Sequence, residues 1–140
     1  MSRVQLALNV SNLAHAVDFY SKLFDTPPAK QRPGYANFAV EQPPLKLVLI
    51  EGHGPGGSLN HLGVEVASAD AVTAARQRFS AEGLQTATEE QVACCYALQD
   101  KVWVDDPDGA PWEVYTVLAD VDEPAGPLPP VCGPGPCAPS

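Results

Sequence analysis

The sequence predicts an α+β fold built from two similar modules, each consisting of a strand, a helix and further strands. Apolar residues alternate with other residues over residues 3–10, which is the period of a β-strand, and then recur at helical spacing over residues 13–24. The same strand pattern returns at residues 61–66 and is again followed by a helical pattern. The chain therefore contains an internal duplication, with modules at about residues 3–51 and 60–118.

Clear start and stop signals delimit the helix of the first module. Ser11 or Asn12 can cap the helix, because either side chain accepts a hydrogen bond from a backbone N–H group of the first turn. Pro27 and the proline after it end the helix, since proline lacks the N–H group and restricts the residue before it. Extended segments are expected to follow over residues 29–32, 35–40 and 45–50.

The second module repeats this order. Ser68 or Asp70 can cap a helix that runs to about Glu82, and Gly83 is a natural helix stop. Between the modules, the glycine-rich residues 52–58 are expected to form a flexible linker, and they lack the Gly-Lys-Ser/Thr ending of a phosphate-binding loop. The strands after the second helix are expected around residues 84–88, 94–97, 102–105 and 112–118.

Composition and charge limit the classes of function. The chain has 140 residues, a net charge of −9 and no basic run, which argues against nucleic acid or an anionic membrane as a partner. Its apolar runs are too short to span a bilayer, and the N-terminal residues start directly in a strand pattern without an apolar signal segment. We therefore expect a cytoplasmic protein with one domain over residues 1–120, followed by a disordered Pro/Gly-rich tail over residues 121–140.

Two adjacent cysteines, Cys94 and Cys95, form the most distinctive motif. Neighbouring thiols do not readily form a disulfide, because the small ring would force an unusual backbone geometry. They can instead present two sulfurs to one soft, thiophilic atom. Thiols stay reduced in the cytoplasm, so these cysteines indicate metal binding or reaction chemistry. The tail adds Cys132 and Cys137, which are either further ligands for a soft atom or ordinary residues of a surface tail.

The duplication also aligns polar residues of the two modules. Gln5 aligns with His61 on the first strand of each module, and Lys46 aligns with Glu113 on the last strand. If the modules pair about a pseudo-twofold axis, these residues converge, and Gln5, His61 and Glu113 can bind a divalent metal. The set resembles the two-histidine-one-carboxylate arrangement of non-haem iron oxygenases, with one histidine replaced by glutamine, and it also suits Mn²⁺ or Ni²⁺.

Each of these residues also has a simpler interpretation. Gln5 can be a polar residue on a half-exposed strand, His61 a core histidine with satisfied hydrogen bonds, and Glu113 a solvent-facing strand residue. The duplication favours the metal set, because it predicts all three positions together.

The duplicated modules, the His61 strand and residues 106–113 resemble the vicinal oxygen chelate superfamily, which includes glyoxalase I, extradiol dioxygenases, and fosfomycin- and bleomycin-resistance proteins. Within it, the chain is most similar to the branch of cadmium-induced proteins and iron-dependent carbon–arsenic lyases. The resemblance spans nearly all of residues 3–118 and is most specific around the cysteine pair. It implies two βαβββ modules whose mixed sheet curves into a cup around a metal or ligand.

The resemblance implies a function and a set of site residues. Such lyases use Fe(II) and O₂ to cleave the carbon–arsenic bond of trivalent methyl- and aromatic arsenicals, and they release arsenite. Carried over by motif, the catalytic metal ligands are Gln5, His61 and Glu113, while Cys94 and Cys95 hold the trivalent arsenic of the substrate.

Lys101 lies in a matching motif and is expected either to bind the substrate or to favour the thiolate form of a nearby cysteine; the simpler alternative is an exposed strand lysine. Two other functions stay open. The protein could sequester cadmium or arsenite through its thiols without catalysis, or it could be a metal enzyme of the glyoxalase or fosfomycin-resistance type. The adjacent cysteines argue against the latter, because its chemistry needs no thiol pair. The chain is compatible with a monomer or with a homodimer that exchanges modules.

Overall fold

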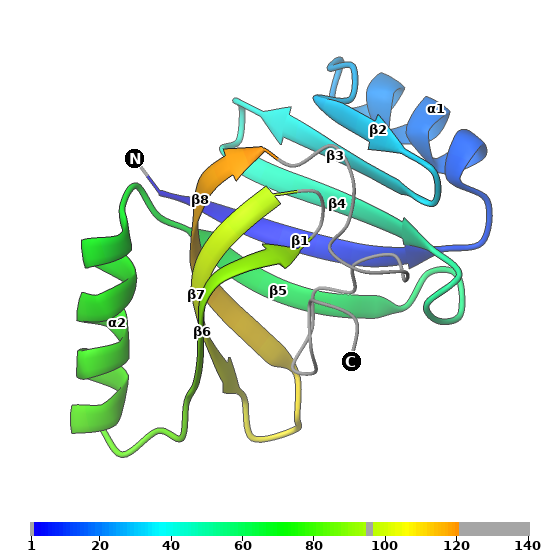
Figure 1. Cartoon of the computed structure of the whole chain (residues 1–140). Coiled ribbons are helices and arrows are strands. Elements are labelled where there is room, and N and C mark those ends of the chain that lie inside the picture. Colours follow the sequence, from blue (N-terminus) through cyan, green and yellow to red (C-terminus); the bar gives the residue numbers. More distant parts are fainter. Residues whose placement is uncertain (1, 95–96, 121–140) are drawn as a thin grey trace. The chain divides into compact units, whose positions relative to one another are not determined.

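The computed structural model describes residues 2–94 and 97–120, which fall into two compact units (Figure 1). The first unit is Arg3–Leu62. The second unit begins at Gly63 and also includes Ser2. The predicted tail, with Cys132 and Cys137, lies outside the described residues, and so does Cys95. Within the described part, neither helix is long and apolar enough to cross a membrane.

The first unit contains one helix and a set of neighbouring strands in the order β2-β3-β4-β1-β5. The pairing of β1 with β4 is parallel, whereas β3 pairs with both β2 and β4 in antiparallel fashion. The elements are β1 (Arg3–Val10), α1 (Leu13–Leu23), β2 (Lys30–Arg32), β3 (Tyr35–Val40), β4 (Leu45–Glu51) and the first part of β5 (Leu59–Glu65).

The second unit repeats this arrangement, with the strand order β5-β8-β7-β6. In both modules the first strand therefore neighbours the fourth, and the fourth neighbours the third. The elements are the last part of β5, α2 (Ala69–Ala81), β6 (Ala87–Cys94), β7 (Ala97–Asp105) and β8 (Pro111–Asp120). The predicted α+β class with βαβββ modules is confirmed, whereas the curved cup concerns both units together and stays a prediction.

Local chemistry fixes the helix starts as the sequence predicts. The Asn12 side chain accepts a hydrogen bond from the backbone N–H of His15, at 3.0 Å. In the second module, the Ser68 hydroxyl accepts one from the backbone N–H of Ala71, at 3.2 Å. Gly83 has a φ of 81°, a left-handed conformation that glycine adopts without steric cost, so the helix ends just before it.

The cap of α1 gives a first testable prediction. Replacing Asn12 by alanine removes the acceptor and should lower the free energy of unfolding by about 1 kcal/mol, measured by urea denaturation. Asn12→Gly is the matched control, because glycine at this position costs only a few tenths of a kcal/mol. Equal losses in both variants would contradict a role for the side-chain hydrogen bond.

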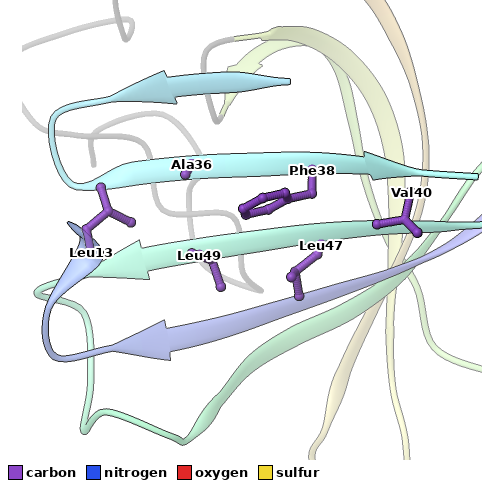
Figure 2. Close-up of a cluster of buried hydrophobic side chains, with 6 residues drawn as sticks. All are labelled: Leu13, Ala36, Phe38, Val40, Leu47 and Leu49. Atoms are coloured by element: carbon purple, nitrogen blue, oxygen red, sulfur yellow. The ribbon is translucent and has the colours of Figure 1, made fainter. Parts of the chain in front are cut away.

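The apolar core of the first unit lies under α1. Alternating residues of β3 and β4 turn toward the helix, and Phe38 at the centre of the cluster is fully buried (Figure 2). Partly buried residues of β1, such as Leu6 and Leu8, pack against the same cluster. Because successive strand residues point to opposite faces, the polar residues of β1 must lie on the face away from the helix.

The strands after α2 differ from the prediction. No strand covers residues 84–86. The predicted strand at residues 94–97 includes residues 95 and 96, which lie outside the described residues, while Cys94 ends β6 and pairs with Ala97, which begins β7. Strand β6 also contains a β-bulge between Glu89 and Val92, where Gln91 takes a φ of 51° and donates its backbone N–H to the Asp100 carboxylate at 2.7 Å. An extra residue in one strand interrupts the alternation on which the prediction depended.

Candidate functional site

The face of the first unit's sheet that points away from α1 is polar and buried. On β1 it carries Gln5, Ala7 and Asn9, all at most 5% exposed. Gln5 is the backbone partner of Lys46 on β4, whose side chain is also buried. Burying polar side chains is costly unless they are hydrogen-bonded. The interpretation of Gln5 as a half-exposed strand residue is therefore wrong, and this face is a candidate functional surface.

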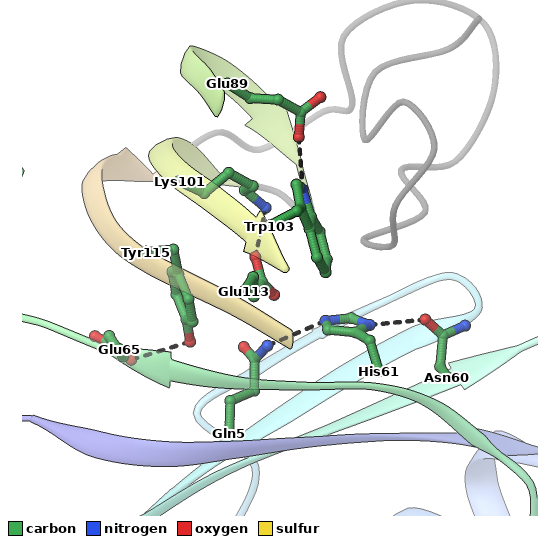
Figure 3. Close-up of polar contacts among 9 residues, drawn as sticks. All are labelled: Gln5, Asn60, His61, Glu65, Glu89, Lys101, Trp103, Glu113 and Tyr115. Atoms are coloured by element: carbon green, nitrogen blue, oxygen red, sulfur yellow. Dashed lines mark hydrogen bonds and ion pairs between the residues drawn. The ribbon is translucent and has the colours of Figure 1, made fainter. Parts of the chain in front are cut away.

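Gln5 and His61, predicted to act together, are in direct contact within the first unit. The side-chain Nε2 of Gln5 lies 3.1 Å from Nε2 of His61, and His61 is fully buried (Figure 3). The other ring nitrogen, Nδ1, lies 2.7 Å from Oδ1 of Asn60. An amide oxygen only accepts, so Nδ1 carries a hydrogen, and an amide nitrogen only donates, so Nε2 presents its lone pair toward Gln5.

The donor chemistry of this pair fits a divalent metal. Metal-binding histidines usually donate their second N–H group to an oxygen acceptor, as His61 does to Asn60. Two donors bound at right angles to one ion, each at about 2.1 Å, lie roughly 3 Å apart, which is close to the Gln5–His61 spacing of 3.1 Å. Turning the Gln5 amide by half a turn brings its oxygen to the place that the nitrogen now occupies.

Glu113 and Lys101 form a buried ion pair within the second unit. Lys101 Nζ lies 2.7 Å from Oε1 of Glu113, and the two side chains are 0% and 2% exposed (Figure 3). The strands β7 and β8 pair so that Trp103 is opposite Glu113 and Lys101 is opposite Tyr115, which places these residues on one face. The interpretations of Lys101 and Glu113 as exposed strand residues are therefore wrong.

Aromatic rings and further carboxylates flank this ion pair. Lys101 Nζ lies 5.4 Å from the ring centre of Trp103 and 5.9 Å from that of Tyr115, within the range of cation–π attraction. The indole N–H of Trp103 donates to Oε1 of Glu89 at 2.9 Å, and the Tyr115 hydroxyl donates to Oε1 of Glu65 at 3.4 Å. These contacts restrain both rings, so Lys101 is held in a defined position against Glu113.

The predicted site residues thus fall into two pairs, Gln5 with His61 in the first unit and Lys101 with Glu113 in the second. Convergence of both pairs on one metal stays a prediction. Over residues 2–94 and 97–120 no three His, Cys, Asp or Glu side chains lie close enough to hold a metal ion together. This absence does not test the predicted set, because its third ligand is a glutamine. Cys94 is the last residue of β6, and Cys95 lies outside the described residues.

Sequence reasoning missed the residues that support His61. Asn60 accepts from its ring and donates to Asn9, which in turn contacts Ser58. One available signal was Asn9, which lies on the same strand face as Gln5 and is equally hard to bury alone. Nothing in the composition of the glycine-rich residues 52–58 indicates that Ser58 completes this chain of contacts.

Two modules of the βαβββ type are the architecture that the sequence resemblance implies, and the structure contains both of them. A model of the Glyoxalase/Bleomycin resistance protein/Dioxygenase superfamily matches residues 3–114, and the chain belongs to this superfamily. The resemblance predicted from the sequence motifs is confirmed.

Individual relatives narrow the comparison. The chain is 62% identical over 120 residues to "Cadmium-induced protein CadI" of Mycobacterium tuberculosis, covering 86% of this chain and 79% of that protein. It is 60% identical over 123 residues to a "Trivalent organoarsenical cleaving enzyme" of Thermomonospora curvata, covering 87% of this chain and 82% of that protein.

A solved structure supports the fold alone. Homoprotocatechuate 2,3-dioxygenase of Brevibacterium fuscum, in an anaerobic substrate complex, superposes with a TM-score of 0.62 at 20% identity. The match covers 86% of this chain and 38% of that one. At this identity the likeness extends to the architecture and not to the chemistry.

Proposed function

We propose that the chain is an Fe(II)-dependent, O₂-using lyase that cleaves the carbon–arsenic bond of trivalent organoarsenicals and releases arsenite. The observation that carries the proposal is the buried contact between Gln5 and His61, whose donor types and 3.1 Å spacing suit one metal ion. It occurs in a chain that is 60% identical to a protein named for cleaving trivalent organoarsenicals.

In this proposal Gln5, His61 and Glu113 hold the metal. When bound, iron supplies the redox chemistry through which dioxygen serves as the oxidant. His61 presents the lone pair of Nε2, and Gln5 presents its amide oxygen. Glu113 forms an ion pair with Lys101, and a carboxylate has two oxygens with about four acceptor positions, so the ion pair is compatible with metal binding. The predicted contact of Lys101 with substrate stays a prediction.

Cys94 and Cys95 hold the substrate. Two thiolates on one trivalent arsenic fix the direction of its third substituent, and this orientation is worth a large part of a reaction barrier. The carbon–arsenic bond breaks, arsenic leaves as arsenite, and the organic group takes up oxygen. A methyl group leaves as formaldehyde and supplies all four electrons that dioxygen accepts, whereas an aryl group leaves as a phenol and the thiol reductant supplies the other two electrons and two protons. Water-exposed thiols alone would bind arsenic without orienting its carbon toward an oxidant.

The test is arsenite release from a trivalent aromatic arsenical. Protein purified without oxygen should contain or take up about one Fe(II) per chain, and it should release arsenite when iron, a thiol reductant and air are all present. Omitting iron or oxygen should stop the release. No arsenite under complete conditions, measured by separating the arsenic species, would refute the proposal.

A second function is favoured by the relatives named as cadmium-induced proteins. In that case the thiols sequester cadmium or arsenite, and the metal set performs no chemistry. Cd²⁺ binding that remains tight and stoichiometric in His61→Ala, together with an absence of turnover in the wild type, would support sequestration. Loss of arsenite release in His61→Ala, with arsenic binding preserved, would support the lyase.

A further inference from the structure

A continuous chain of hydrogen bonds runs from the glycine-rich loop to His61, entirely within the first unit. The Ser58 hydroxyl lies 2.6 Å from the carbonyl oxygen of Pro55, and the Asn9 amide nitrogen lies 2.9 Å from Ser58 Oγ. Asn60 Nδ2 lies 3.0 Å from Oδ1 of Asn9. Asn60 Oδ1 lies 2.7 Å from Nδ1 of His61, as Figure 3 shows. We call this series of hydrogen-bonded residues the relay; its members are Pro55, Ser58, Asn9, Asn60 and His61.

The polarity of the relay is set at its far end. A backbone carbonyl can only accept, so the Ser58 hydroxyl must donate its single hydrogen to Pro55. Ser58 Oγ is then an acceptor for the Asn9 amide group, which leaves the Asn9 oxygen facing the Asn60 amide group. The Asn60 oxygen consequently faces His61, and only the Nδ1–H form of the ring can satisfy it.

Backbone hydrogen bonds fix the position of Asn9, so its side-chain amide keeps the orientation that Ser58 requires. Its backbone N–H donates to the Ser58 carbonyl at 2.9 Å, and its own carbonyl accepts from Gly57 at 2.8 Å. A methyl group at Gly54 would come within 2.7 Å of the Asn9 amide nitrogen. Residues 52–58, predicted to be a flexible linker, are thus anchored to β1 by the backbone of Asn9, with glycine required where Gly54 approaches it.

We propose that Ser58, Asn9 and Asn60 are positioning residues that lock His61 in the Nδ1–H tautomer and aim the lone pair of Nε2 at the metal. The part that concerns the metal rests on the proposed function, whereas the tautomer is a property of the metal-free chain. Without the relay, an isolated imidazole can exchange its hydrogen between the two ring nitrogens, so that only a part of the population presents the Nε2 lone pair.

The tautomer can be measured directly on the metal-free, full-length protein. The chain has 3 histidines, so long-range ¹H–¹⁵N correlation spectra should resolve each ring, with His61→Gln identifying the signals of His61. We expect His61 to show a protonated Nδ1 and an unprotonated Nε2. In Asn60→Ala both nitrogens should instead show averaged shifts, because the acceptor for Nδ1–H is gone and the Gln5 amide can turn to face Nε2 with either its nitrogen or its oxygen.

Metal affinity supplies the second measurement. Titration of the apo-protein with Fe(II) or Mn(II) should show about a 10- to 100-fold weaker affinity in Asn60→Ala, the usual loss when a partner of a metal-bound histidine is removed. Ser58→Ala and Gly54→Ala should also lower the Nδ1–H population and the metal affinity, but by less than Asn60→Ala does. Asn60→Asp keeps an oxygen acceptor for Nδ1–H and should restore most of the affinity.

Asn37→Ala is the matched control, because Asn37 is another buried asparagine of the first unit and donates to the Tyr35 hydroxyl, outside the relay. It should leave the His61 tautomer and the metal affinity unchanged. A wild-type His61 with its hydrogen on Nε2, or an Asn60→Ala variant indistinguishable from Asn37→Ala, would overturn the proposal. An absence of arsenite release with the predicted tautomer intact would refute the lyase function and leave the relay standing.

Discussion

Arsenite release is expected to fall by a factor of about a hundred or more when Cys94 or Cys95 is replaced by serine. Chelation by two linked ligands typically exceeds the affinity of one by about 10²- to 10⁴-fold, and a serine hydroxyl is a poor ligand for a soft atom. The affinity for a trivalent arylarsenical, followed by titration, should therefore fall together with turnover. Fe(II) affinity should not change, since the proposed metal ligands are on other strands.

The tail provides the control for this experiment. A chain with both Cys132 and Cys137 replaced by serine retains the adjacent pair and should keep its turnover. If the tail cysteines were the arsenic ligands, the tail variant would lose activity and Cys94→Ser would retain it. Wild-type arsenic affinity in Cys94→Ser and Cys95→Ser would refute the assigned roles.

The parts of the fold that local chemistry determines were predictable from the sequence. Asn12 and Ser68 cap the two helices because each supplies an acceptor just before an apolar periodic segment, and Gly83 ends α2 because it tolerates a φ of 81°. The irregular course of β6 was not predictable. The bulge at Gln91 depends on a carboxylate nine residues away, and such a contact leaves no periodic signal.

For the candidate site, the duplication predicted which residues matter but not how they contact one another. It aligned Gln5 with His61, and the two are hydrogen-bonded. It assigned Glu113 to a metal, and the family resemblance assigned Lys101 to substrate, whereas the side chains of these two residues form an ion pair. That contact follows from the register of β7 against β8, which depends on tertiary pairing and on the irregularity near Leu98. The alternation of apolar and polar residues along a strand could assign each residue to one face of the sheet, but it could not predict which residue of the neighbouring strand lies opposite.

The Lys101–Glu113 pair should make the chain sensitive to the loss of either charge. Removing one partner of a buried ion pair leaves the other charge buried without a counter-charge, at a cost of about 3–5 kcal/mol. Lys101→Met and Glu113→Gln should each lower the free energy of unfolding by about that amount in urea denaturation. The double variant should recover much of the loss, because it leaves no unpaired buried charge, and additive losses would show that the pair is not coupled.

Measurements of metal affinity distinguish the role of Glu113 from that of Lys101. Glu113→Gln and the double variant should both lose most of their Fe(II) affinity, because an ionised ligand is gone. Lys101→Met keeps the Glu113 carboxylate and removes a neighbouring cation, so its Fe(II) affinity should match or exceed that of the wild type despite its lower stability. If Lys101→Met and Glu113→Gln instead lose iron equally, the loss follows from breaking the ion pair, and Glu113 acts as the structural partner of Lys101 rather than as a metal ligand.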